Sequence, residues 1–146
     1  MDEFIKLLDE NLEYVDHEMF DDKIYITVVS TRKEVNCPYC GEPSSKVHSR
    51  YERIFQDLPM QDKKVTIILR NRKMFCDNQD CHHNTFAETF ECLPFKAKRT
   101  KRLDAEIITL SINISSLTAA TFLKSSVADI GKSTVCNLIK KKKSDD

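Results

Sequence analysis

The spacing of apolar residues changes near residue 95 of this 146-residue chain. Before that point, the runs 23–30 and 63–75 are rich in β-branched and aromatic residues and predict two strands. The segment 14–20 is expected to pair with the first of these strands across a turn at Asp21-Asp22. The first part of the chain is therefore expected to be rich in β-structure.

Shorter elements flank these strands. Apolar residues at helical spacing predict a short helix over 3–12. Pro59, Gln61 and Asp62 predict a turn before the second strand, and 85–90 is a short segment in which polar and apolar residues alternate. Together with the strands, these elements complete the predicted first module.

Helical spacing replaces the strand pattern in the rest of the chain. A first helix is predicted over 101–114. A second helix is indicated by four apolar residues, Leu117, Ala120, Phe122 and Leu123. Ser133 is a suitable N-cap for a third helix, which ends in four consecutive lysines. The predicted fold class is therefore α+β, with a β-rich module over 1–94 and a basic three-helix module over 95–146.

Charge is distributed unevenly, although the formal net charge is zero. Residues 1–22 carry a net charge of −8, residues 23–95 carry +2 and residues 96–146 carry +6. A basic end of this kind favours contact with a polyanion such as nucleic acid. Two oppositely charged, solvated faces explain the same pattern equally well, so charge alone does not identify a partner.

Hydrophobic residues make up 40% of the chain, which is enough for a core. No apolar run reaches the roughly 18 residues that a membrane-spanning helix needs. The N-terminus begins with Asp2 and Glu3 and lacks the basic and then apolar pattern of a secretory signal. We therefore expect a cytoplasmic protein with no membrane partner. In that compartment, clustered cysteines bind metal or react more often than they form disulfides.

Two close pairs of cysteines are the most informative chemical feature. Cys37 and Cys40 are separated by two residues, and Cys76 and Cys81 by four. Zinc prefers a tetrahedron of thiolates, and each short turn supplies two sulfurs. Gly41 follows the first pair and permits the positive φ that a zinc knuckle requires. The sequence predicts one structural Zn²⁺ on these four cysteines, in a zinc-ribbon-like module with no coordination position open for catalysis.

Other roles for the cysteines stay open. A redox Cys-x-x-Cys requires a βαβ setting, and the segment between the two pairs shows no helix of that kind. A metal-free core role is a further alternative. Cys92 is a spare ligand if Cys81 is not used, and either His82 or His83 is a substitute ligand. Cys136 is expected to be a small buried residue of the third helix.

The second module fits a helix-turn-helix imperfectly. Val135 is an apolar anchor early in the third helix, and Leu138 follows on the same face. Asp129 stands where a turn glycine is common, and Lys124 occupies a position that is usually apolar. The alternative is a small helical bundle with a frayed lysine tail. The candidate DNA contacts combine the polar face of the third helix with a second basic cluster: Lys132, Ser133, Thr134, Asn137, Lys140, Lys141, Lys98, Arg99, Lys101 and Arg102.

Several motifs occur in an order that resembles a known family. They are Cys-Pro-Tyr-Cys-Gly at 37–41, Val-His-Ser-Arg-Tyr at 47–51, Asp-Leu-Pro at 57–59, the run 70–76, Cys81 and Thr-Phe-Ala-Glu at 85–88. This set resembles the N-terminal zinc-binding region of a bacterial insertion-sequence transposase family of the DDE type. The resemblance implies zinc at the four cysteines. It also implies that the second module, a helix-turn-helix in that family, binds double-stranded DNA at the terminal repeats of the element.

In that family, an RNase H-like catalytic domain follows, and this chain ends at Asp146 before any such domain. We therefore expect a truncated, DNA-recognising part of a transposase that is not an enzyme on its own. Its expected partners are terminal-repeat DNA and either a second copy of the chain or a full-length transposase. Two alternatives stay open. One is a zinc-ribbon module that docks on protein through acidic residues 1–22, and the other is a thiol redox enzyme with a low-pKa cysteine and no metal.

Overall fold

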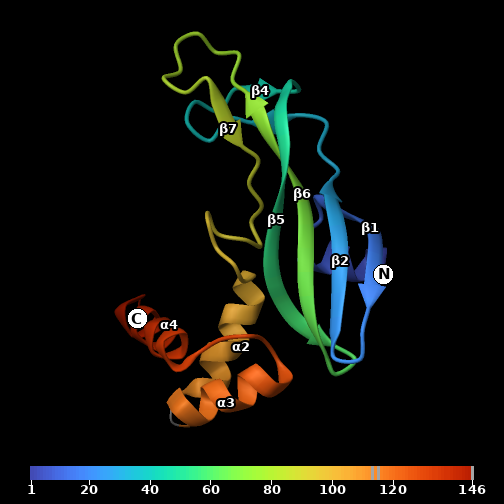
Figure 1. Ribbon diagram of the computed structural model, residues 1–146. Helices are drawn as coiled ribbons and strands as arrows, with labels where there is room; N and C mark the ends of the chain where they lie inside the picture. The colour runs from blue at the N-terminus through green and yellow to red at the C-terminus, as the bar shows by residue number, and fades with distance from the viewer. Residues whose placement is uncertain (113, 115, 146) are drawn as a thin grey trace.

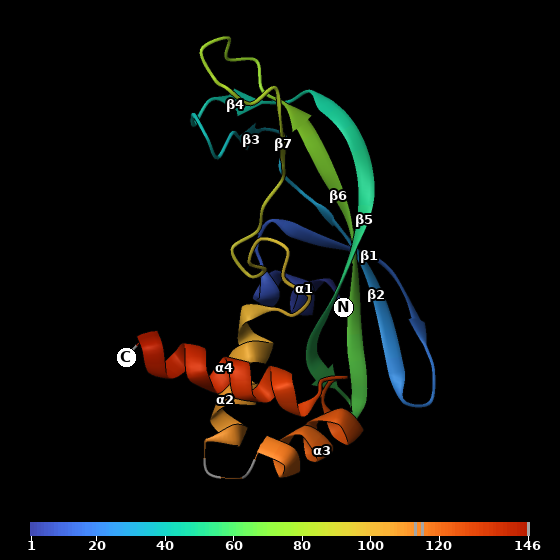
Figure 2. The same ribbon diagram turned by 60° about the vertical axis from the view of Figure 1, so that its left-hand side comes forward.

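The computed structural model describes residues 1–112, 114 and 116–145, and its class is α+β as predicted. The β-rich part contains α1 (Asp2–Leu8), β1 (Leu12–Met19), β2 (Lys23–Ser30), β3 (Val35–Asn36), β4 (Pro43–Ser44), β5 (Val47–Met60), β6 (Lys63–Phe75) and β7 (Thr85–Ala87). The helical part contains α2 (Lys101–Ser111), α3 (Ser116–Ser126) and α4 (Lys132–Asp145). Figures 1 and 2 show a tall sheet with β3, β4 and β7 at one end and α2–α4 at the other.

The main sheet has the strand order β1-β2-β6-β5, and β7 pairs with β6. β1 and β2 are antiparallel across the turn at Asp21-Asp22, which confirms the predicted hairpin. β2 and β6 run parallel, with Ile26 beside Ile67. Residues two apart along a strand share a face, and the buried residues of β2 and β6 alternate in this way. The long-range pairing places the buried residues of the two strands side by side on the same face of the sheet.

β5 and β6 form a hairpin that runs most of the length of the molecule (Figure 1). Gln61 and Asp62 have φ values of 52° and 62°, the left-handed region used by tight hairpin turns, and they confirm the predicted turn. Pro59 lies inside β5 and not in the turn. The sequence does not predict β5 over its full length, because residues 48–52 are all exposed and mostly polar and show no alternation.

α1 is shorter than the helix predicted over 3–12. Asp9 has extended backbone with φ −157°, and its carboxylate accepts a hydrogen bond from the Asn11 N–H at 2.9 Å. The chain therefore leaves the helix after Leu8. Leu12 is fully buried as the first residue of β1, so its apolar character belongs to a strand and not to another helical turn.

α1 and the segment that follows β7 cover the same face of the sheet (Figure 2). Ile5 and Leu8 of α1 pack there together with Phe90 and Leu93. Their partners are the inward residues of β2 and β6, so this core joins the N-terminal helix to the chain that leads toward α2.

Three helices occur in the regions where the sequence predicts them. The three helices share one apolar core, which includes Leu103, Ile107, Leu123 and Val135. α2 ends at Ser111, and the predicted extension to 114 includes Asn113, which lies outside the described residues. Whether α3 and α4 work as a helix-turn-helix stays a prediction.

The helix starts differ in part from expectation. α4 begins at Lys132, so Ser133 lies inside its first turn and the predicted N-cap is wrong. At a different helix, α2, a side-chain cap is present: the Thr100 hydroxyl accepts a hydrogen bond from the Leu103 N–H at 3.3 Å. Among the described residues, no helix is both long and apolar enough to cross a membrane.

Polar contacts fasten the helices to the sheet. The Asp57 carboxylate of β5 accepts hydrogen bonds from the Thr100 hydroxyl at 2.7 Å and from Nε of Arg102 at 2.9 Å. Asp129, between α3 and α4, accepts a hydrogen bond from Nζ of Lys64 at 2.9 Å. These contacts cross from the sheet to the helices. The division between 1–94 and 95–146 stays a prediction as a domain boundary.

Candidate metal centre

Two turns at one end of the sheet bring four cysteines together. The sulfurs of Cys37, Cys40, Cys76 and Cys81 all lie within 4.8 Å of one another. Sγ of Cys40 and Sγ of Cys76 are 3.6 Å apart, which is far too long for a disulfide bond. A regular tetrahedron with zinc–sulfur bonds of about 2.3 Å has sulfur–sulfur edges of about 3.8 Å. The cluster is therefore compact enough to hold a metal ion such as zinc.

The first turn is shaped by its own backbone. The Gly41 N–H donates to the Cys37 carbonyl at 2.7 Å, and the Cys37 N–H donates to the Glu42 carbonyl at 2.9 Å. These bonds fold the chain between β3 and β4 so that both sulfurs point to the same side. Gly41 has φ +81°, in the region that a side chain rarely tolerates, which is why a glycine follows the pair.

The second turn follows the end of β6. The Cys76 N–H donates to the Asn84 carbonyl at 2.8 Å and closes the base of the loop. Inside it, the Cys81 N–H donates to the Asn78 carbonyl at 3.1 Å, and Oδ1 of Asn78 accepts the Asp80 N–H at 3.0 Å. Asn78 thus folds the four-residue spacer into a compact turn and lets Cys81 reach the other sulfurs.

An aromatic contact joins the two turns independently of the sulfurs. The rings of Tyr39 and His83 stack with centroids 3.5 Å apart and an interplanar angle of 6°. This contact gives His83 a role other than that of a ligand. Among the described residues, the group that could hold a metal consists of the four cysteines and includes neither His82 nor His83. Cys92 packs against the core of the sheet and also lies outside this group.

The sulfurs differ in how readily they lose a proton. The backbone N–H of Glu42 donates to the sulfur of Cys40 and lowers the pKa of that thiol to about 7. At Cys76, the backbone N–H of Asn78 acts in the same direction. Burial and the neighbouring thiols outweigh it, and they raise the pKa of Cys76 to about 12.

Cys81 resembles Cys76 in this respect. The backbone N–H of His83 lowers the pKa of the Cys81 thiol, but burial and the neighbouring sulfurs have the larger combined effect and raise it. At neutral pH, Cys81 and Cys76 hold protons that a metal ion displaces on binding.

A small apolar cluster lies beneath the cysteines. Val35, Met74 and Phe86 are buried there around Cys37, which is itself only 1% exposed. These residues come from β3, β6 and β7, so the metal centre and its apolar floor are built from the same strands. The floor excludes water from one side of the sulfurs, which favours a closed, structural site.

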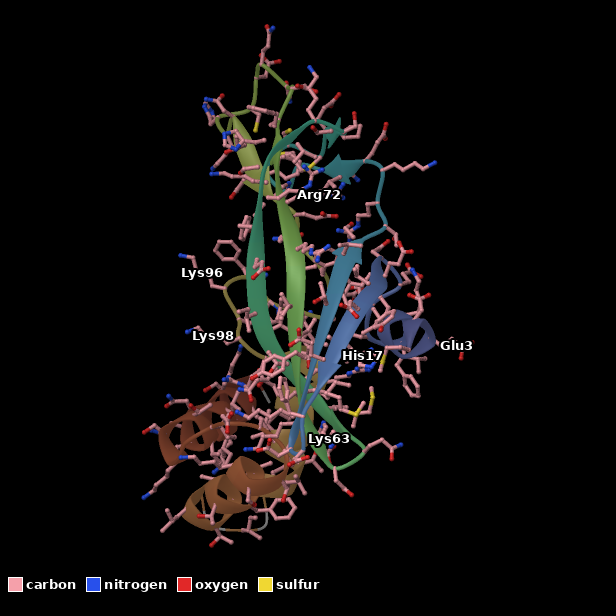
Figure 3. The ribbon with its side chains drawn as sticks, turned by 45° about the vertical axis from the view of Figure 1, so that its right-hand side comes forward. Glu3, His17, Lys63, Arg72, Lys96 and Lys98 are labelled. Atoms are coloured by element: carbon pink, nitrogen blue, oxygen red, sulfur yellow. The ribbon has the colours of Figure 1, made fainter. Side chains whose placement is uncertain are left out.

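A buried carboxylate supports this end of the sheet, and sequence reasoning missed it. The side chain of Glu88 has no exposed surface and pairs with Arg72, whose Nε lies 2.8 Å from Oε1 of Glu88. The Ser30 hydroxyl donates to the other carboxylate oxygen, and Arg32 lies 3.4 Å from it. Figure 3 labels Arg72 just below the cysteine turns. The only sequence signal was a charged residue that shares the alternating phase of Phe86 and Phe90 in the segment 85–90, a position that calls for a partner if it is buried.

The basic candidates lie at the opposite end of the molecule. Lys132, Ser133, Asn137, Lys140 and Lys141 are exposed on α4, and Thr134 is half-buried. Lys98 and Lys101 are exposed before and at the start of α2, and Figure 3 shows Lys98 on the outer edge above the helices. Their contact with DNA stays a prediction.

Two of the candidate arginines already have partners within the protein. Nε of Arg99 lies 2.6 Å from the Asp104 carboxylate. Arg102 binds Asp57, which raises the pKa of the Arg102 guanidinium further, chiefly through that hydrogen bond. These two arginines therefore hold the start of α2 in place, whatever else they contact.

Residues 33–81 match the family described as the zinc-finger of transposase IS204/IS1001/IS1096/IS1165. The matched segment contains all four clustered cysteines together with β3 to β6. It supports a transposase zinc region in this part of the chain, and the helical part lies outside it. No curated protein and no solved structure matches the chain.

Proposed function

We propose that this chain is the zinc-stabilised, DNA-binding N-terminal portion of a transposase. It recognises the terminal repeats of an insertion element through its helices and has no strand-transfer activity of its own. The single observation that carries the proposal is the four-cysteine cluster inside the segment similar to a transposase zinc-finger.

The metal supplies structure in this proposal. Four thiolates occupy all four coordination positions of a tetrahedral zinc ion, so no position is left for water or substrate. The ion ties the turn after β3 to the turn after β6. It thereby fixes one end of the β5–β6 hairpin, whose other end contacts the helices.

DNA binding is proposed for the exposed side of α4. Val135 is fully buried in the helical core and sets the orientation of the helix. Asn137 and Lys141 lie one turn apart on the opposite side, with Ser133 one turn before them. An asparagine amide can read an adenine edge, and lysines bind phosphates. One helix face thus offers both kinds of contact.

The lysines near α2 extend this surface in the proposal. Lys98 and Lys101 are exposed on the chain that enters α2, and their ammonium groups suit a phosphate backbone. We assign Arg99 and Arg102 a supporting role, since each is bound to a carboxylate of the protein.

The test is binding of the full chain, purified with zinc, to a labelled duplex from the ends of the element that carries its gene. A scrambled duplex of equal length is the control. Specific recognition predicts affinity for the element end that is at least about a thousandfold higher. Equal affinity for both duplexes indicates a non-specific binder. No binding to either at low salt supports the zinc-ribbon protein-interaction module instead.

A further inference from the structure

A groove of about 500 Å³ lies between α2 and α4. Its floor is apolar and includes Ile108, Ile112 and Leu138. Its rim carries Lys101 and Lys141, and the one carboxylate in the lining, Asp104, is paired with Arg99 at 2.6 Å. Ile112 is 62% exposed, which is unusual for an isoleucine beside a helical core. The groove thus combines an uncovered apolar floor with positive charge at its edge.

α1 has the complementary surface. Phe4 and Leu7 are 56% and 77% exposed, and because they are three residues apart they lie on one side of the helix. Glu3 and Glu10, both exposed, flank them with negative charge. Figure 3 shows Glu3 projecting away from the body of the protein.

The other side of α1 is fixed in place. Ile5 is 3% exposed and packs in the core of the sheet with Leu8. The Asp2 carboxylate accepts a hydrogen bond from the Tyr14 N–H at 3.0 Å. With these anchors in place, α1 cannot turn Phe4 and Leu7 into the groove of its own chain, so they stay available to another molecule.

We propose that α1 of one copy docks into the α2–α4 groove of a second copy, with Phe4 and Leu7 on the apolar floor and Glu3 facing the lysines of the rim. The proposal follows from charge complementarity between the first 22 residues, with net charge −8, and residues 96–146, with net charge +6. It also follows from the match of an exposed apolar pair to an exposed apolar floor.

The contact joins two different surfaces, so it is head-to-tail. Two copies joined by one contact keep one free α1 and one free groove between them, so association continues with concentration unless a ring closes. The contact is small for a stable interface, so we expect it to be weak and sensitive to salt. Phe4, Leu7 and Glu3 belong to no proposed DNA contact, but Lys101 and Lys141 of the rim do, so DNA and a docked α1 would compete for these two lysines.

Sedimentation velocity of the full chain, over a concentration series at low and high salt, tests the proposal. The wild-type protein is expected to associate reversibly at low salt and to dissociate at high salt. Leu7→Asp is expected to weaken association by about tenfold or more, since an apolar contact is replaced by a charge. Leu117→Asp is the matched control: Leu117 is 63% exposed on α3 and does not line the groove, so association should persist.

Charge reversal tests the pairing itself. Glu3→Lys and Lys141→Glu are each expected to weaken self-association. An equal mixture of the two variants should restore it, because the unchanged α1 of Lys141→Glu meets the unchanged groove of Glu3→Lys, and the reversed helix meets the reversed groove. The proposal is overturned if the wild type stays monomeric at low salt, if Leu117→Asp weakens association as much as Leu7→Asp, or if the mixture associates no better than each variant alone. Binding to DNA by the Leu7→Asp variant is a separate readout and bears only on the proposed function.

Discussion

Asp57 on β5 and Arg102 on α2 form a two-point ion pair at the junction of sheet and helices. Nε of Arg102 lies 2.9 Å from Oδ1 of Asp57, and a guanidinium nitrogen also reaches Oδ2. The Asp57 side chain is only 4% exposed, and the Thr100 hydroxyl donates to it as well. A buried carboxylate needs such partners to stay charged, so the pair fixes where α2 begins relative to the sheet.

Asp57→Asn tests this junction. The amide keeps the shape but loses the charge that Arg102 requires. We expect a loss of about 2–3 kcal/mol in the free energy of unfolding, because a buried partner of a charged group is removed. Chemical denaturation followed by circular dichroism measures it. Glu52→Gln, at an exposed position of the same strand, should change stability by less than about 0.5 kcal/mol. An equal loss in both variants would show that Asp57 has no special role.

Cys40→Ser is expected to abolish tight zinc binding. Serine has nearly the same size but is a poor zinc ligand, so one corner of the tetrahedron is lost. Zinc content of the purified protein, measured by elemental analysis, should fall from about one ion per chain to well below that. Cys136→Ser, which changes a cysteine on α4 away from the cluster, should retain the metal. Full zinc content in Cys40→Ser contradicts the assignment of the four ligands.

Removal of zinc by a strong chelator should loosen one end of the molecule. Without the ion, the turns after β3 and β6 are held mainly by their own hydrogen bonds and by the Tyr39–His83 stack. Hydrogen exchange is expected to accelerate over residues 37–90, most strongly in the cysteine turns. α2, whose core contains no clustered cysteine, should keep its protection. Uniform protection before and after chelation would show that the metal has no structural role.

Zinc affinity should rise steeply with pH. The pKa of Cys76 is raised to about 12 and that of Cys81 is also raised, so both thiols are protonated at neutral pH and zinc must displace their protons. Lower pH therefore favours the metal-free protein. With at least two protons released, the apparent affinity should rise by at least about a hundredfold per pH unit near pH 7. Competition with a chromophoric chelator at several pH values measures this, and a pH-independent affinity contradicts thiol ligation.

Asp129→Asn should weaken the link between the α3–α4 turn and the sheet. The hydrogen bond from Lys64 lowers the pKa of the Asp129 carboxyl, so the carboxylate contributes stability at neutral pH that is lost as pH falls through the lowered pKa. Because Asp129 is about half exposed, we expect at most about 1 kcal/mol at pH 7. Wild type and variant should converge in acid. A difference that persists there points to the backbone contacts of Asp129 with Gln56.

Asn137→Ala and Lys140→Ala should affect DNA binding differently. Loss of a base contact at Asn137 is expected to reduce discrimination between sequences by about 1–3 kcal/mol, and loss of a phosphate contact at Lys140 to weaken all duplexes alike and flatten the salt dependence. Titration of labelled duplexes at several salt concentrations separates the two effects. Lys33→Ala, an exposed lysine between β2 and β3, is the charge-matched control and should change neither.

The sequence by itself determined the features that depend on near neighbours. β2 and β6 follow from runs of β-branched residues, and the turn at Gln61-Asp62 follows from local backbone preferences. The four clustered cysteines could also be named in advance as candidate metal ligands, because a short spacing brings two sulfurs of a turn to the same side. In each case, the chemistry is settled within a few residues along the chain.

Only the tertiary structure decided how these pieces meet. The parallel pairing of β2 with β6, the length of β5 and the Asp57–Arg102 pair join residues that are far apart in sequence. No local pattern distinguishes an exposed charged residue from one whose partner arrives from another element. Burial does so, because a carboxylate such as that of Glu88 can stay inside the protein only where folding brings arginines to it.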